Sequence, residues 1–101
     1  MSTKSSTECD SPELFSNLTS EQQKILLIWI DENLAPIQSF NDRHTSYGLK
    51  HIFGESQNGF YIYNGAFKGA MLKSGYHVQD ETALNWVFNI SQKSKAFQSH
   101  H

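Results

Sequence analysis

Apolar residues recur at helical spacing in three stretches of the chain and alternate with polar residues in a fourth. The first helical stretch follows Thr19 and Ser20, and each of these has a glutamine at the third position after it, as in a capping box. The stretch KILLIWIDENL is apolar around much of its circumference, and Pro36 ends it because proline disfavours helical geometry in the preceding residue. We expect this helix to be central and buried on two sides.

The second helical stretch covers residues 46–53, SYGLKHIF, and Gly54 stops it. Ser46, Lys50 and His51 are expected to face water. Apolar residues at i, i+3 and i+4 form the expected buried stripe, which consists of Leu49, Ile52 and Phe53.

The third helical stretch has the clearest ends. Asn64 is a favourable N-cap, residues 65–74 (GAFKGAMLKS) form the body, and Gly75 followed by the apolar Tyr76 is typical of a Schellman ending. The inward side is expected to comprise Phe67, Ala70 and Met71. The outward side is expected to comprise Gly65, Lys68, Gly69 and Leu72.

Beyond this helix the hydrophobic period falls from about 3.6 residues to about 2. Residues 76–79 form a short extended piece, and residues 84–90 (LNWVFNI) alternate in polarity, so two strands joined by a polar turn predict a β-hairpin. The predicted fold class is α+β, mostly α: a three-helix winged-helix-like domain with a C-terminal two-stranded β-hairpin.

The two ends of the chain are polar and poor in apolar side chains. Residues 1–16 are therefore expected to be a flexible N-terminal tail, residues 17–92 the winged-helix-like domain, and residues 93–101 a flexible C-terminal tail. The terminal pair, His100 and His101, is compatible with either a native end or an added one.

Composition narrows the class of protein. The chain has 101 residues, 38% of them hydrophobic, which suits one small domain, and no apolar run approaches a membrane span. The first residues lack the apolar core of a secretory signal. A single cysteine, Cys9, excludes an internal disulfide framework and a multi-cysteine zinc site. The net charge of −2 argues against a protein that binds nucleic acid through a broadly basic surface.

Nothing in the sequence predicts an enzyme. The chain has no GxSxG motif, no phosphate-binding glycine loop and no carboxylates spaced as an acid–base pair. The histidines lack the spacing of a zinc site, and we interpret His44, His51 and His77 as ordinary polar residues. We therefore expect no catalytic residues, no metal site and no cofactor.

A nucleic-acid site is the favoured hypothesis. Residues 33–79 hold four basic residues against two acidic ones, and the N-terminal end of a third winged-helix helix reads base edges. Tyr61 and Tyr63 could offer rings on which unpaired bases stack. An acidic turn at Asp80 and Glu81 counts against DNA. The predicted nucleic-acid-binding residues are Arg43, Lys50, Tyr61, Tyr63, Asn64, Lys68 and Lys73.

A protein contact is the alternative. Gly65 and Gly69 each weaken a helix by about 1 kcal/mol relative to alanine, so a helix that keeps both of them lets something approach closely. The approaching group would be another helix of the same chain, a second copy in a homodimer, or a foreign protein, with Leu72 adding an apolar contact.

Residues 45–91, with the segments SYGLKH, NGAFKGAMLKSGY and NWVFN, resemble small proteins without an assigned activity from prophages and mobile elements of Gram-positive bacteria. The segment AFKGAMLKSGYHV also resembles the winged-helix tail of phage and plasmid primase-helicases. The first resemblance implies a protein of the bacterial host cytoplasm, and the second implies nucleic acid as a partner.

The predicted function is therefore that of a small phage or mobile-element DNA-binding protein, either a regulator or a replication accessory, which binds single- or double-stranded DNA through helix 64–74. The alternative is a non-enzymatic phage-encoded inhibitor or adaptor that binds a host protein such as a defence nuclease. Neither role involves a membrane.

Overall fold

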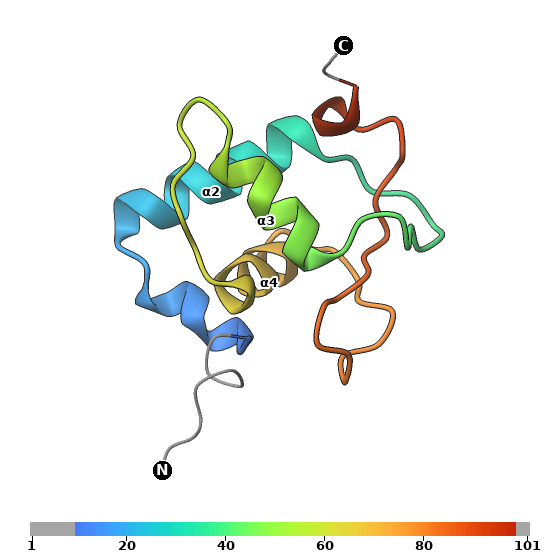
Figure 1. Cartoon of the computed structure of the whole chain (residues 1–101), viewed down its shortest axis with the longest axis horizontal. Helices are drawn as coiled ribbons and strands as arrows, with labels where there is room; N and C mark the ends of the chain where they lie inside the picture. The colour runs from blue at the N-terminus through green and yellow to red at the C-terminus, as the bar shows by residue number, and fades with distance from the viewer. Residues whose placement is uncertain (1–9, 99–101) are drawn as a thin grey trace.

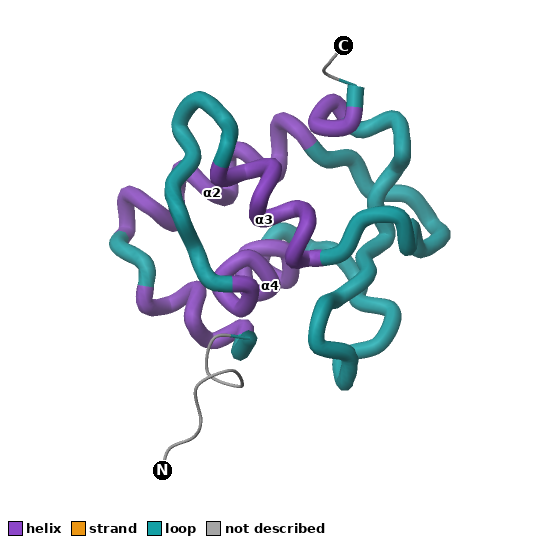
Figure 2. Tube along the Cα trace, viewed as in Figure 1, coloured by secondary structure: helices purple, strands orange, loops and turns teal. Residues whose placement is uncertain are grey.

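The computed structural model describes residues 10–98. Within this range lie three α-helices and two short 3₁₀ helices: η1 (Pro12–Asn17), α2 (Ser20–Asn33), α3 (Ser46–Gly54), α4 (Asn64–Lys73) and η2 (Lys95–Phe97). The larger helices gather on one side of the molecule, and the long loops after α2 and after α4 lie together on the other (Figures 1 and 2). Helix α4 packs against η1, α2 and α3.

Helix α2 begins and ends where the sequence predicts. The Thr19 side chain accepts a hydrogen bond from the Gln22 N–H at 3.1 Å, and the Gln22 side chain accepts one from the Thr19 N–H at 3.0 Å. This reciprocal capping box confirms the predicted start. The expectation that α2 is the central helix is wrong, because only Leu26 and Ile30 are fully buried within it.

The central helix is α4. Every residue from Asn64 to Met71 is buried, including Gly65, Lys68 and Gly69, which were expected to face outward. Its C-terminal end confirms the predicted Schellman motif: Gly75 has φ +92°, and the Tyr76 N–H donates to the Met71 carbonyl at 3.0 Å. The predicted N-cap is wrong: Tyr63 is the N-cap, without a side-chain cap hydrogen bond, and Asn64 is the first residue of the helix. The burial of α4 depends on an element that the pattern did not predict.

The described residues contain no β-strand, so the predicted β-hairpin and the winged-helix-like fold class are wrong. The segments around Val78 and Phe88 do lie antiparallel, but they share one isolated bridge. Two further isolated bridges join the same C-terminal segment to the loop after α2: Thr45 with Val87 and Pro36 with Ile90. The domain is an all-helical bundle with an irregular extended segment packed along it.

Asn89 explains why no strand forms. The Ile90 N–H donates to the Phe88 carbonyl at 3.0 Å, a tight turn that bends the chain at Asn89. The Asn89 side chain then accepts from the His77 N–H at 2.8 Å and donates to the Ile37 carbonyl at 2.9 Å. The Asn89 side chain thus adds two links to the scattered backbone hydrogen bonds, such as that from the Ile37 N–H to the Asn89 carbonyl at 3.0 Å, which join these segments without forming a ladder.

Ordered structure extends beyond the predicted domain at both ends. Most of η1 falls in the segment expected to be a tail, yet Phe15 is only 8% exposed and belongs to the core. Near the C-terminus, Ser94 is 2% exposed and accepts a hydrogen bond from the Ala35 N–H, and Phe97 stacks on His44. The remaining parts of both expected tails, with Cys9, His100 and His101, lie outside the described residues.

Candidate functional site

Three tyrosines project from α3 and from the segment before α4. Tyr47 is 52% exposed, Tyr61 is 73% exposed and Tyr63 is 48% exposed. Tyr47 shares a face of α3 with His51, one turn later, whereas Tyr61 and Tyr63 flank a buried isoleucine in extended backbone and so point the same way. We call this surface the tyrosine face and define it by Tyr47, Lys50, His51, Tyr61 and Tyr63.

Lys50 lies at the centre of the tyrosine face. Its ammonium nitrogen is 5.3 Å from the centroid of the Tyr47 ring and 4.8 Å from that of Tyr61, within the range of cation–π attraction. The residue was expected to face water but is only 7% exposed, and its burial lowers the pKa of its ammonium group. The lysine side chain therefore packs against the Tyr47 and Tyr61 rings, and its charge stays close to the surface that these rings form.

Edge-to-face contacts complete this cluster. The Tyr47 and His51 rings meet with centroids 4.6 Å apart, and those of Tyr61 and Tyr63 with centroids 5.8 Å apart. The structure thus brings together three residues predicted for nucleic-acid binding, Lys50, Tyr61 and Tyr63. Sequence reasoning missed Tyr47 and His51, although their i, i+4 spacing on an exposed helix face was a usable signal.

Two other predicted contact residues are inside the protein. Asn64 is 6% exposed, and its side-chain nitrogen donates to the Asp10 carboxylate at 3.0 Å and to the Asn85 side-chain oxygen at 2.9 Å. Lys68 is 3% exposed and donates to the Asp10 carbonyl at 3.1 Å. Burial lowers the pKa of Lys68, and the charge of Asp10 opposes that shift. Neither side chain is available to read a base edge in this fold.

The glycine face of α4 is occupied by the chain itself. A Cβ atom at Gly65 would overlap the Ser11 carbonyl oxygen, and one at Gly69 would overlap the Pro12 carbonyl oxygen. Of the three partners considered for this face, the structure shows another segment of the same chain, η1. Leu72 remains 42% exposed at the edge of this contact.

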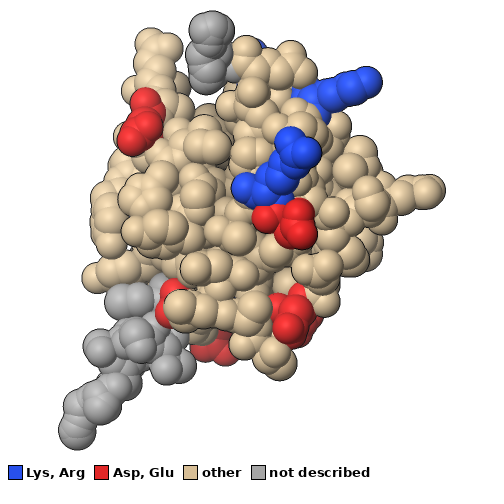
Figure 3. All heavy atoms as spheres, turned by 45° about the vertical axis from the view of Figure 1, so that its right-hand side comes forward, with Lys and Arg blue, Asp and Glu red and all other residues tan. Residues whose placement is uncertain are grey.

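The two remaining predicted cations are exposed. Lys73 ends α4, about 15 Å along the helix from Tyr63, and lines a depression together with Asp31. Arg43 lies in the loop before α3. On the face drawn in Figure 3, lysines and arginines are few, and those near its centre stand beside an acidic residue, so that face carries no broad basic surface.

Within residues 10–98, no group of three or more histidine, cysteine or acidic residues is arranged to hold a metal ion. None of the helices in that range has the length and apolarity needed to cross a lipid bilayer. His44, one of the histidines considered, instead stacks on Phe97 with ring centroids 3.7 Å apart and shares a 3.1 Å hydrogen bond with Gln92.

Comparison with known proteins gives no further guide. No protein-family model, no curated protein and no solved structure matches the chain. The chemistry of the tyrosine face is therefore the basis on which a function is inferred.

Proposed function

We propose that this protein is a non-enzymatic nucleic-acid-binding protein that holds single-stranded segments on its tyrosine face. The observation that carries the proposal is the exposure of Tyr47, Tyr61 and Tyr63 around the Lys50 ammonium group. Stacking of an unpaired base on an aromatic ring contributes about 1–3 kcal/mol, and every base has a π face to offer. The Lys50 side chain is only 7% exposed, but its charge lies within 5.3 Å of two ring centroids and adds attraction for the phosphates that connect those bases.

Single strands suit this surface better than a duplex. Reading a major groove requires a helix whose N-terminal side chains project, and α4 is buried over its first eight residues. With a net charge of −2, the chain also has few cationic side chains that could contact phosphates. If Lys50 makes one phosphate contact, the logarithm of the binding constant should fall by about 0.7 per decade of salt.

The wider role in this proposal is that of a regulator or replication accessory of a phage or mobile element, acting in the bacterial cytoplasm. It is supported only by the resemblance of residues 45–91 to prophage proteins. The binding proposal does not depend on that resemblance.

The test is fluorescence anisotropy of labelled oligothymidine and of a matched duplex, at about 50 and 200 mM salt. Wild-type protein should bind the single strand more tightly than the duplex. Tyr61→Ala should weaken this binding about tenfold or more. The matched control is Phe40→Ala, which removes an aromatic ring that is 41% exposed in the loop after α2 and outside the tyrosine face.

The control variant should bind as the wild type does, with unchanged melting temperatures for both variants. An equal loss in Tyr61→Ala and Phe40→Ala, or no binding of the single strand even at the lower salt, would overturn the proposal.

A second candidate, a protein-binding inhibitor or adaptor, is favoured by one observation. A cavity of about 280 Å³ adjoins Tyr61 and Tyr63, and its other walls are mostly apolar. Exposed tyrosines beside an apolar pocket are typical of the energetic centre of protein interfaces. The remaining walls are Leu14, Asn17, Leu18, Ile62 and Ala66. Failure of the oligonucleotide experiment would leave this candidate as the function of the tyrosine face.

A further inference from the structure

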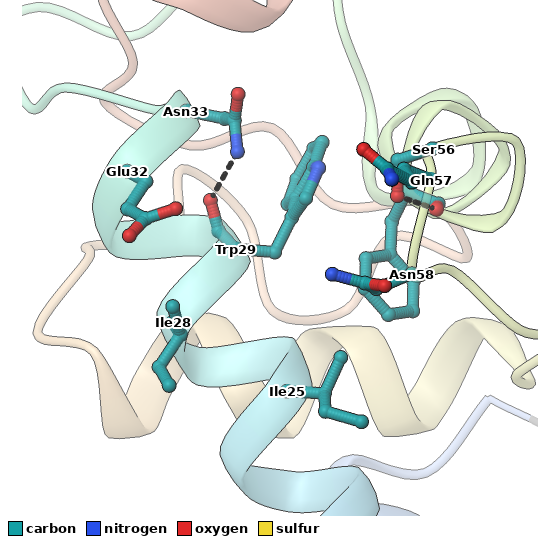
Figure 4. Close-up of a pocket in the computed structure, with 9 residues that line it drawn as sticks. Ile25, Ile28, Trp29, Glu32, Asn33, Ser56, Gln57 and Asn58 are labelled. Carbon is teal, nitrogen blue, oxygen red and sulfur yellow. Dashed lines mark hydrogen bonds between the residues drawn. The ribbon is translucent and has the colours of Figure 1, made fainter.

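A second pocket lies between the C-terminal half of α2 and the turn that follows α3. Its volume is about 350 Å³, within the range of pockets that bind small ligands or single side chains. Figure 4 shows the Trp29 indole standing in the middle, with Glu32 and Asn33 on one side and Gln57 and Asn58 on the other. The complete lining is Ile25, Ile28, Trp29, Glu32, Asn33, Phe53, Ser56, Gln57 and Asn58.

The pocket combines an aromatic wall with oxygen acceptors. The Trp29 ring is fixed by edge-to-face contacts with Phe53 and Phe67, whose centroids lie 5.5 and 6.5 Å away. The Asn33 side-chain nitrogen donates to the Trp29 carbonyl at 3.0 Å, which leaves the Asn33 side-chain oxygen as an acceptor. Ile28, 49% exposed, adds an apolar surface below the ring (Figure 4).

The charge of the pocket is negative. Glu32 is the only charged residue among the nine that line it, and in Figure 4 its carboxylate takes part in none of the marked hydrogen bonds. Glu32 lies in the last turn of α2, which holds no basic residue. A carboxylate at the negative end of a helix dipole is unfavourably placed, and a cation bound against Glu32 would relieve this arrangement.

We propose that this pocket binds the guanidinium group of an arginine side chain presented by a partner protein. A guanidinium is planar, stacks on an indole and donates paired hydrogen bonds to a carboxylate, so Trp29 and Glu32 match its two recognition features. The isoleucines match the apolar stem of the side chain. This site uses none of the residues of the tyrosine face and is independent of the proposed function.

The lining also distinguishes an arginine within a polypeptide from the free amino acid. Free arginine carries an α-ammonium and an α-carboxylate besides its guanidinium; the carboxylate would require a basic partner, and none of the nine lining residues is basic. An arginine inside a chain has neither of these charges, and its backbone could run across the open mouth of the pocket.

The test is a titration of the full ¹⁵N-labelled protein with Nα-acetyl-arginine amide, followed by two-dimensional NMR. We expect saturable shifts of the Trp29 indole N–H and of the Asn33 and Asn58 side-chain amides, with a dissociation constant of about millimolar size. Glu32→Gln should weaken binding about tenfold or more, because it removes a charged hydrogen-bond acceptor.

Asp31→Asn is the matched control. It removes the same charge from the same helical turn, but Asp31 lines a different depression, with Lys73 and Tyr76. Binding in this variant should stay within about twofold of wild type, since exposed charges of this kind interact weakly through solvent.

Three results would overturn the proposal. Equal binding in Glu32→Gln and wild type, or the lack of saturable shifts at Trp29, would remove the site. Equal binding of Nα-acetyl-lysine amide would remove the guanidinium preference. Tighter binding of free arginine than of the blocked form would identify a small-molecule ligand in place of a partner protein.

Discussion

The Lys68 ammonium nitrogen lies 4.8 Å from the centroid of the Trp86 ring, inside the protein. Lys68 is 3% exposed and Trp86 is 5% exposed, so this cation–π pair is shielded from water. The pair joins α4 to the C-terminal extended segment, and the hydrogen bond from Lys68 to the Asp10 carbonyl ties the N-terminal segment to the same point. A residue that resembles a surface cation in the sequence is thus a structural link between three parts of the chain.

The first prediction follows from that pair. Lys68→Ala should lower the free energy of unfolding by about 1–3 kcal/mol, because the packed stem is lost and the Asp10 carbonyl loses its donor. Lys68→Met should recover part of the loss by restoring the stem. Urea denaturation measures both. Lys73→Ala, at the exposed end of the same helix, is the control and should change stability by less than about 0.5 kcal/mol; a loss as large as that of Lys68→Ala would contradict the assignment.

Two glycines on different helices should respond to alanine in opposite directions. At Gly69 a Cβ would overlap the Pro12 carbonyl oxygen, whereas at Gly48 in α3 nothing lies within 4 Å. Gly48→Ala should therefore stabilise the protein by about 0.5–1 kcal/mol through helix propensity. Gly69→Ala should destabilise it despite the same gain, by about 2 kcal/mol. Thermal unfolding distinguishes them, and a rise in melting temperature for both variants would show that η1 does not press on α4.

Asn89 offers a test of the irregular C-terminal segment. Asn89→Ala removes two hydrogen bonds to segments on either side and leaves their backbone groups unpaired, so the free energy of unfolding should fall by about 2 kcal/mol. Asn58→Ala, at an exposed loop position, should have little effect. Urea denaturation is again the measurement. If the two variants are equally stable, the hydrogen bonds of the Asn89 side chain do not stabilise the contacts between these segments.

Stability should depend on pH through His44. Burial, with a smaller contribution from Arg43, lowers the pKa of His44, and the hydrogen bond that the Gln92 side-chain oxygen accepts from the ring opposes this shift. The unfolded chain therefore binds this proton more readily than the folded one. The stabilisation is complete above the unfolded pKa of about 6.5 and is lost as the pH falls from there through the lowered folded pKa.

His44→Gln should flatten this part of the pH profile, measured as urea midpoints at about pH 7.5 and about pH 5.5. His77→Gln, at an exposed position, serves as the control. A His44→Gln profile as steep as that of the wild type would exclude His44 as the source.

Local signals in the sequence predicted the start of α2 and the end of α4, and long-range packing explains much of what they missed. Thr19 with Gln22, and Gly75 with Tyr76, determine helix ends through contacts within a few residues, so their patterns can be read directly. Helix η1 has a local start signal, Ser11 as N-cap followed by Pro12, but its docking on α4 is a long-range contact that no local pattern predicts. The alternation of residues 84–90 is genuine, yet Leu84 is 63% exposed and Asn89 breaks the ladder.

The residues of the candidate sites likewise include some that the sequence could predict and some that it could not. Exposure of Tyr61 and Tyr63 could be predicted from alternation around a buried Ile62. The burial of Lys50 and Lys68 could not, because a charged residue at a helical surface position normally faces water and only the three-dimensional arrangement provides rings to cover its stem. The Trp29 pocket forms only because the turn after α3 packs next to α2. The sequence pattern does not predict this packing.

The contact between η1 and the glycine face of α4 also defines how this protein could diverge. Backbone atoms of residues 11 and 12 stand where two side chains would otherwise be, so positions 65 and 69 and the N-terminal segment can change only together. In a diverged copy, a larger residue at position 69 would mean that the N-terminal segment no longer packs on α4. Lys68 would then lose the contact with that segment that keeps it from water. The residue at that single position therefore serves as a marker, in any descendant of this gene, for whether the N-terminal segment is still docked.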